Sequence, residues 1–193
     1  MIILPDCDLV FNEKRGVFLV EGNWEELTCP ICKASLKYRD QVPRLMRYYN
    51  GEKAYVMIER RICQNPDCHK LHRCLPSHLT RYKHFLTEII EDTVDEIVLP
   101  EDPEDPTAVK TGASIESPSL RTVARWKEWI RHNTANINGY LKAVGHSILG
   151  LSTQFLKSGI SLLDELRKDG GGGWLSAVQQ VIYNAGGFLE PYY

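Results

Sequence analysis

The sequence predicts an α+β protein with a β-rich N-terminal part, residues 1–76, and a helical part, residues 77–193. Three observations predict this division. Alternating apolar residues surround an Asn-Gly pair in the first part. Apolar residues then recur at helical spacing from residue 79, and a second helical pattern follows a Ser-Pro pair at residue 117.

The composition is typical of a globular chain, with 43% hydrophobic and 25% charged residues. It excludes collagen-like, low-complexity and wholly disordered proteins. Residues 1–10 have no basic segment before an apolar run, and no stretch approaches the ~20 apolar residues that span a bilayer. We therefore expect a cytoplasmic protein without membrane association. In that compartment, paired cysteines bind metal or perform redox chemistry more often than they form disulfides.

The net charge of −2 hides a strong segmental pattern. Residues 33–84 carry a net +8 and residues 117–168 a net +5, whereas residues 85–116 carry a net −9. If the fold brings the two basic segments to one face, that face would attract phosphates despite the near-neutral total. Ordinary clustering of solvated charge is the alternative.

Two short cysteine pairs are the clearest chemical signal in the chain. The first is a CxxC pair, Cys29 and Cys32, and the second is a CxxxxC pair, Cys63 and Cys68. Zn²⁺ prefers four ligands in a tetrahedron, and two short turns can each supply two sulfurs. The sequence therefore predicts a structural zinc site with these four ligands and no open position for catalysis.

The segment between the pairs predicts a β-hairpin, with strands at residues 44–49 and 52–62. Asn50-Gly51 is a strong hairpin signal because both residues tolerate positive φ. Two cysteine turns joined by a hairpin make a zinc ribbon, in which the metal supplies much of the folding free energy.

Other residues near the second pair leave alternatives open. His72 could replace one cysteine ligand, and Cys74 also lies close in sequence. No second cysteine lies near Cys7 in the sequence, and Cys7 fits a small buried apolar residue. A redox CxxC motif is a further alternative, but it usually needs a thioredoxin-like βαβ context, which the pattern lacks.

The helical part begins with a predicted helix over residues 79–97, with Ser77 as its N-cap. A second helix, residues 118–131, follows Ser117 and Pro118, a pair typical of a helix start. Arg121, Thr122 and Arg125 occupy its outer face, as in a recognition helix that enters the DNA major groove. A plain amphipathic helix with solvated arginines is the alternative.

Additional basic residues are candidates for phosphate contacts: Arg60, Arg61, Arg81 and Lys83. The acidic residues concentrate in residues 85–105, on one helix end and a proline-rich loop at residues 100–106. We interpret them as solvated charge, not as the converging carboxylates of a metal-dependent nuclease. The sequence therefore predicts no enzyme. Helical patterns over residues 138–167 and 174–183 predict a packed C-terminal part or a dimer contact.

An ordered set of motifs resembles an uncharacterised Gram-positive bacterial family that pairs a zinc ribbon with a helix-turn-helix. The motifs are Cys29-Pro30-x-Cys32, Arg60-Arg61-x-Cys63, Cys68, His72-x-x-Leu75-Pro76, Tyr82-Lys83-His84, Pro118-Ser119-x-x-Thr122-x-x-Arg125-Trp126-x-x-Trp129, Trp174-Leu175 and Asn184-x-Gly186. In that family the second cysteine pair is usually CxxC. Its members look like the N-terminal DNA-binding part of insertion-element transposases, so the resemblance implies DNA binding and a mobile-element origin.

These observations lead to one expected function and two rivals, of which one is the enzyme, a transposase or nuclease, that the acidic residues disfavour. We expect a DNA-binding protein with structural zinc, related to transposition or transcriptional control, whose partner is double-stranded DNA. The other rival is a zinc-ribbon interaction module without DNA affinity. Its partner would be a larger transposase or a second copy of the chain.

Overall fold

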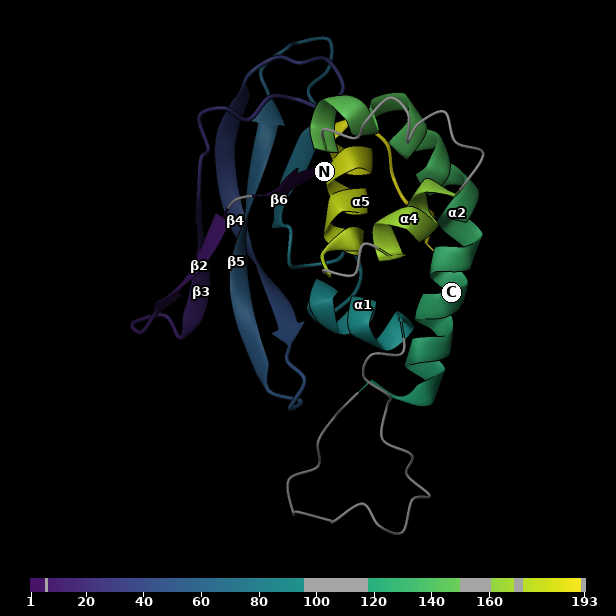
Figure 1. The fold of residues 1–193 in the computed structure, drawn as a ribbon. Helices are drawn as coiled ribbons and strands as arrows, with labels where there is room; N and C mark the ends of the chain where they lie inside the picture. Colours follow the sequence, from purple (N-terminus) through teal and green to yellow (C-terminus); the bar gives the residue numbers. More distant parts are fainter. Residues whose placement is uncertain (6, 96–117, 150–160, 169–171, 192–193) are drawn as a thin grey trace.

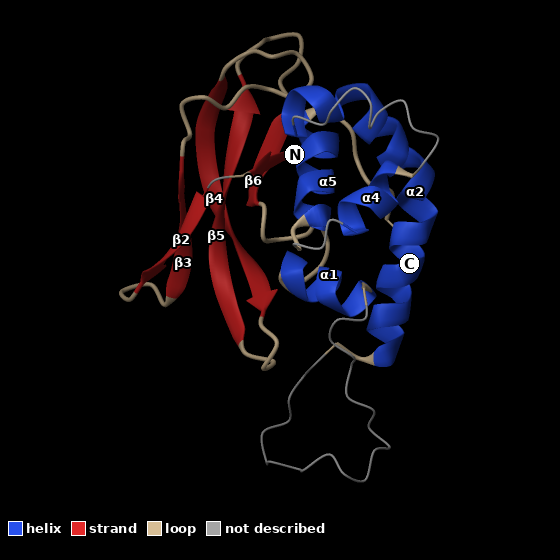
Figure 2. Ribbon diagram, in the orientation of Figure 1, coloured by secondary structure: helices blue, strands red, loops and turns tan. Residues whose placement is uncertain are grey.

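The computed structural model describes residues 1–5, 7–95, 118–149, 161–168 and 172–191. Within them, every strand lies in residues 2–76 and every helix begins after residue 86, so the predicted α+β class is confirmed. Figure 2 shows the strands on one side of the molecule and the helices on the other. The predicted loop at residues 100–106 lies outside the described residues.

A six-stranded sheet is built around one long strand. The strands are β1 (Ile2–Leu4), β2 (Cys7–Asn12), β3 (Val17–Gly22), β4 (Leu36–Arg47), β5 (Lys53–Cys63) and β6 (Leu71–Pro76). On one side, β5 pairs with β4 along its length; on the other, it pairs with β3 and, nearer its end, with β6. A strand buried between neighbours needs apolar residues, and Val56 and Ile58 of β5 are nearly inaccessible.

The predicted hairpin is present as β4 and β5, although β4 starts at Leu36, well before the expected residue 44. Gly51 has a positive φ of 76° and its N–H donates to Tyr48 O, so the turn depends on this glycine. The register pairs Leu36 with Cys63 at the opposite end of the hairpin. Both cysteine pairs therefore belong to the end of the sheet away from the turn.

The short strand β1 connects the sheet to the helices. It runs parallel to β6, with Ile3 opposite Leu75. The Ile3 N–H donates to Asn184 Oδ1 over 2.9 Å, and Asn184 Nδ2 donates to Ile3 O over 2.9 Å. One side-chain amide thus satisfies both backbone groups of Ile3 along the edge of β1 that no described strand pairs with.

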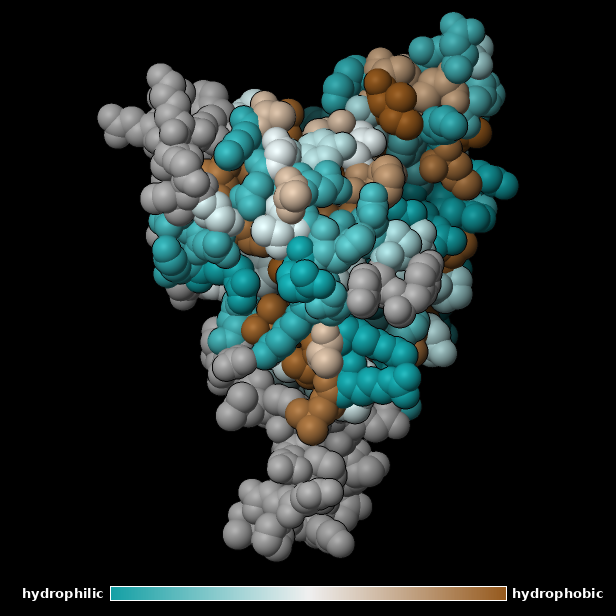
Figure 3. Space-filling view, turned by 90° about the vertical axis from the view of Figure 1, so that its right-hand side faces the viewer, coloured by the Kyte–Doolittle hydropathy of each residue, from teal (hydrophilic) through white to brown (hydrophobic). Residues whose placement is uncertain are grey.

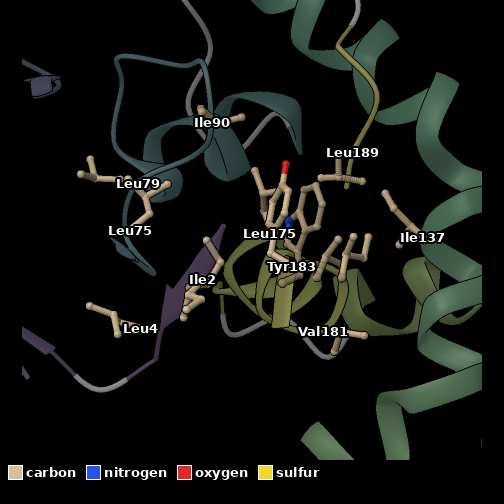
Figure 4. Close-up of a cluster of buried hydrophobic side chains, with 14 of the residues drawn as sticks. Ile2, Leu4, Leu75, Leu79, Ile90, Ile137, Leu175, Val181, Tyr183 and Leu189 are labelled. Carbon is tan, nitrogen blue, oxygen red and sulfur yellow. The ribbon is translucent and has the colours of Figure 1, made fainter. Parts of the chain in front are cut away.

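Four described helices pack beside the sheet: α1 (Thr87–Val94), α2 (Leu120–Leu149), α4 (Leu162–Lys168) and α5 (Trp174–Asn184). In Figure 1, α5 lies between the sheet and α2. Figure 4 shows the resulting core, where β1, the segment after β6, α1, α5 and α2 contribute side chains to one apolar cluster. Its centre includes Tyr183 and Leu175, which are at most 2% exposed.

The predicted helix over residues 79–97 is much shorter, because α1 begins only at Thr87. The preceding backbone is held by tertiary contacts: Arg44 Nη2 donates to the carbonyls of Thr80 and Lys83, and Thr87 N donates to His78 O. Ser77 is not an N-cap either, because its Oγ donates to Pro5 O. These partners replace the hydrogen bonds that a helix would make, so apolar spacing alone was misleading.

The predicted helix over residues 118–131 was also wrong in extent, and residues 150–160 of the predicted helix over residues 138–167 lie outside the described residues. The first continues without interruption as α2 to Leu149, and Gly139 lies inside it. Ser119 accepts the Thr122 N–H at the start, and the predicted N-cap, Ser117, lies outside the described residues. Residues 95–119 separate α1 from α2, and residues 96–117 among them lie outside the described part of the chain, so no helix-turn-helix is seen among the described residues.

Two acidic residues that we expected to be solvated instead join α1 to the C-terminal helices. Glu91 is 2% exposed and accepts hydrogen bonds from the backbone N–H groups of Gly173, Leu175 and Ser176 at the start of α5. Burial raises the pKa of this carboxyl, although the three donors oppose the shift. One turn later, Asp95 accepts from Arg167 and from Trp174 Nε1.

Candidate functional site

The first cysteine pair lies in a tight turn before β4. Lys33 N donates to Cys29 O and Cys29 N donates to Ala34 O, both over 2.8 Å. Lys33, directly after Cys32, has a positive φ of 63°. This left-handed residue reverses the chain, so that both sulfurs of the pair point to the same side of the turn.

The second pair is built on a similar plan despite its longer spacing. Cys63 is the last residue of β5 and donates its N–H to Lys70 O. Cys68 and His69 both donate their N–H groups to Asn65 O, and His69 has a positive φ of 45°. A left-handed residue thus follows the second cysteine of each pair, and the two additional residues are accommodated in the Asn65 turn.

The four predicted ligands converge. The sulfur atoms of Cys29, Cys32, Cys63 and Cys68 all lie within 4.8 Å of one another. The Cys29–Cys68 sulfur distance is 3.8 Å and the Cys32–Cys63 distance is 3.3 Å. Tetrahedral Zn–S bonds of about 2.3 Å place sulfurs roughly 3.8 Å apart, whereas a disulfide needs about 2 Å. This four-cysteine cluster therefore fits a metal ion.

The electrostatics of the four-cysteine cluster favour a cation. The Ala34 N–H lowers the pKa of the Cys32 thiol to about 7, whereas burial raises the pKa of the Cys63 thiol to about 12. Four thiolates this close repel one another, so they can ionise together only around a positive charge.

His72, the alternative ligand, lies beside the four-cysteine cluster. It is 2% exposed, and its Nε2 lies 3.3 Å from Cys29 Sγ. Its Nδ1 lies 3.3 Å from Met1 N, a donor, so Nε2 is the nitrogen that donates to the sulfur. Burial lowers the pKa of His72 to about 4, which keeps the ring neutral. The geometry makes His72 a hydrogen-bond donor to a ligand.

The other two cysteines lie outside the four-cysteine cluster. Cys74 is inaccessible in β6, and burial raises the pKa of its thiol to about 12. Cys7, in β2, lies with its sulfur 3.7 Å from Leu4 O. Neither belongs to the described group of converging metal-binding side chains.

We expect His72→Phe to weaken metal binding about ten-fold, because donors to metal ligands typically contribute 10- to 100-fold in affinity. The phenyl ring keeps the buried shape but loses both the N–H donor to Cys29 Sγ and the acceptor that faces Met1 N. Competition with a chromophoric chelator measures the affinity. His132→Gln is the control, since His132 is exposed on α2 and lies outside the four-cysteine cluster. Equal affinities of both variants and the wild type would show that the His72 contact does not tune the metal.

The predicted phosphate-binding residues do not form a single group. Arg60 makes a bidentate ion pair with Asp40. Arg61 pairs with Glu59 over 2.9 Å, stacks 4.9 Å from the Trp24 ring and is 13% exposed at its side chain. Both guanidinium groups therefore have carboxylate partners within the sheet, which sequence spacing did not reveal.

A concavity beside the N-terminal half of α2, which we call the α2 groove, is lined by three other predicted contact residues, Lys83, Thr122 and Arg125. It has a volume of about 410 Å³. Its basic side chains are Arg47, Lys83, His84 and Arg125. Its remaining side chains are Tyr82, Phe85, Thr122 and Trp126. Among the described residues, no Asp or Glu lines it, so the groove is strongly positive.

Aromatic contacts hold the α2 groove in place. The rings of Phe85 and Trp126 pack edge to face with centroids 5.3 Å apart. Lys83 Nζ lies 4.9 Å from the Trp129 ring. Burial lowers the pKa of Lys83, and nearby Arg125 lowers it further, which reflects repulsion between the two cations.

Arg121 and Arg81 lie apart from the α2 groove. Arg121 is exposed on α2, whereas the Arg81 guanidinium covers the Tyr82 ring at 4.4 Å. Figure 3 shows that the helical face of the molecule is mostly hydrophilic, with small separate apolar patches. No described helix is long and apolar enough to cross a membrane.

The fold and the site define an α+β protein with a four-cysteine cluster at one end of its sheet and a basic groove beside its longest helix. The chain belongs to the family described as Domain of unknown function (DUF6431), whose pattern matches residues 29–126. That range contains the four-cysteine cluster and every residue that lines the α2 groove. No curated protein and no solved structure matches the chain.

Proposed function

We propose that this protein binds DNA through the α2 groove and that the four-cysteine cluster holds a structural zinc ion. The α2 groove is the observation that supports DNA binding. It brings Lys83 together with Thr122 and Arg125, residues from the two basic segments of the sequence, in an acid-free concavity of the described structure. Phosphates would relieve the repulsion between its cations.

Zinc is the metal that fits the donor set best. The four cysteine sulfurs lie within 4.8 Å of one another, and four cysteine ligands are typical of structural zinc. Because four thiolates fill the coordination sphere, no position remains for water, and the site has no catalytic role. The ion ties the turn before β4 to the end of β5, and so supports the sheet against which the segment after β6 packs.

The proposed contact surface differs from a helix-turn-helix. It combines the start of α2 with residues 82–85, the segment between β6 and α1. The resemblance to transposase DNA-binding parts supports a role in transposition or transcriptional control. Arg121, exposed on the same helix, would add a contact at the rim.

Removing cations from the α2 groove tests DNA binding. We expect Arg125→Gln to weaken binding several-fold and to reduce the slope of log affinity against log salt concentration by about one. The double variant Arg125→Gln, Lys83→Gln should reduce that slope by about two relative to the wild type. Fluorescence anisotropy with a labelled duplex of about 20 base pairs across a salt series measures both quantities. Lys142→Gln is the matched control, because Lys142 is exposed on α2 and lies outside the α2 groove.

Two results would contradict the proposal. The zinc-loaded protein could show no salt-dependent affinity for any DNA, which would favour the rival interaction module. Alternatively, Lys142→Gln could weaken binding as much as Arg125→Gln, which would place the contact elsewhere. Removal of zinc by a chelator, with recovery when zinc is restored, tests whether the four-cysteine cluster supports the binding surface.

A further inference from the structure

Tyr82 has an unusual backbone and an exposed ring. Its φ is +61°, in the left-handed region that tyrosine rarely adopts, and its side chain is 61% exposed. Two sets of contacts hold the Tyr82 backbone in this conformation. Lys83 N–H donates to Thr80 O, and Arg44 donates to the carbonyls of Thr80 and Lys83. A strained and exposed aromatic residue, held by its surroundings, is a typical feature of a binding site.

Tyr82 lines a second concavity as well as the α2 groove. This concavity, which we call the arginine hollow, has a volume of about 490 Å³. Arg44, Arg73 and Arg81 line it around an apolar floor that includes Ile58 and Leu75. Tyr82 therefore stands at the boundary between two positively charged concavities.

The arginine hollow contains unbalanced positive charge. Burial lowers the pKa of Arg44 to about 10, and the charge of nearby Arg73 acts in the same direction. Within the described residues, the buried Nε of Arg44 has no hydrogen-bond acceptor. Arg60 also lines the hollow but is paired with Asp40. An anion in the hollow would supply an acceptor and reduce the repulsion between the arginines.

We propose that a single-stranded polynucleotide lies across Tyr82, with phosphates in the arginine hollow and the α2 groove and a base stacked at the Tyr82 ring. This inference rests on the proposed function and names the form of nucleic acid. Basic tracks interrupted by exposed aromatic rings are the usual construction of single-strand binding surfaces.

The shape of the surface favours a single strand over a duplex. A recognition helix must project into a major groove about 12 Å wide, whereas Thr122 and Arg125 form one wall of a concavity whose other wall is residues 82–85. A duplex hides its bases in the stack and cannot offer one to Tyr82. A flexible single strand can bend into both concavities and place a base between them.

The test compares a labelled oligothymidine of about 15 nucleotides with a duplex of the same length by anisotropy on the zinc-loaded full chain. We expect the oligothymidine to bind at least about ten-fold more tightly. Tyr82→Gly removes both the ring and the left-handed strain, and should weaken oligothymidine binding about ten-fold. Because a paired base cannot stack on the ring, Tyr82→Gly should weaken duplex binding less than oligothymidine binding, and it should leave the melting temperature unchanged. Tyr82→Phe should bind oligothymidine like the wild type.

Tyr55→Ala is the matched control, because Tyr55 is 51% exposed on β5 and lines neither concavity. Tighter binding to the duplex, or equal oligothymidine affinity of Tyr82→Gly and the wild type, would overturn the inference and leave the proposed function intact. Absence of binding to both probes would instead overturn the proposed function. Preference for oligouridine over the duplex, with the same loss in Tyr82→Gly, would support the inference for RNA strands.

Discussion

Cys63→Ser is expected to abolish metal binding and to lower the stability of the sheet by about 5 kcal/mol or more. Structural zinc supplies roughly 10–16 kcal/mol in small zinc peptides, and a typical domain has only about 5–15 kcal/mol in total. Cys63 ends β5, the strand that pairs with β3, β4 and β6. Losing its sulfur therefore releases both cysteine turns from the end of the central strand β5.

Elemental analysis of the purified protein and thermal unfolding with and without chelator measure the two effects. Cys7→Ser is the matched control, because Cys7 lies outside the four-cysteine cluster and a hydroxyl can keep its contact with Leu4 O. The variant Cys63→Ser should melt like the chelator-treated wild type. Full metal content in Cys63→Ser, or a melting temperature insensitive to chelator, would contradict a structural metal at these four sulfurs.

Glu91→Ala is expected to destabilise the protein by about 3 kcal/mol or more, because it leaves the buried N–H of Leu175 and the partly buried N–H groups of Gly173 and Ser176 without an acceptor. Glu91→Gln should cost less, since burial already favours the neutral carboxyl and the amide oxygen can still accept. Chemical denaturation gives the free energies of unfolding. Neither substitution should change the metal content, which separates this effect from that of Cys63→Ser.

The control for this prediction is Glu88→Ala, an exposed glutamate one turn earlier on α1. It removes the same charge and should cost only a few tenths of a kcal/mol, in line with surface substitutions. If Glu88→Ala and Glu91→Ala had equal effects, the carboxylate of Glu91 would be no more than a helix-surface charge.

Local signals in the sequence predicted the hairpin and the four-cysteine cluster well. The Asn-Gly turn and the alternating apolar residues depend on neighbours only a few positions away in the sequence. The rest of the fold therefore has little effect on the structure that they predict. The cysteine spacings work for the same reason, because each short turn aims its own two sulfurs. The sequence did not show that the β4–β5 register brings the two turns together, since that pairing begins at Leu36, before the predicted strand.

The failures share a tertiary cause. The helix expected from residue 79 is interrupted because Arg44, from β4, binds the Thr80 and Lys83 carbonyls. Arg60 was predicted to contact phosphate, but the β-bulge beside Tyr38 places Asp40 opposite it, and the two side chains form an ion pair. Glu91 looked solvated because nothing near it in sequence needs a carboxylate; its partners begin at Gly173. Such long-range partners leave no periodic or spacing signal.

The contact between Ile3 and Asn184 has a consequence for how the chain is made. During synthesis β1 leaves the ribosome before α5, yet the amide that satisfies the outer backbone groups of Ile3 belongs to α5. Until then, the exposed edge could recruit a strand from another nascent chain. Once α5 packs against β1, Asn184 makes the two hydrogen bonds with Ile3 that a neighbouring strand would otherwise make, so the edge of β1 can no longer pair with another chain.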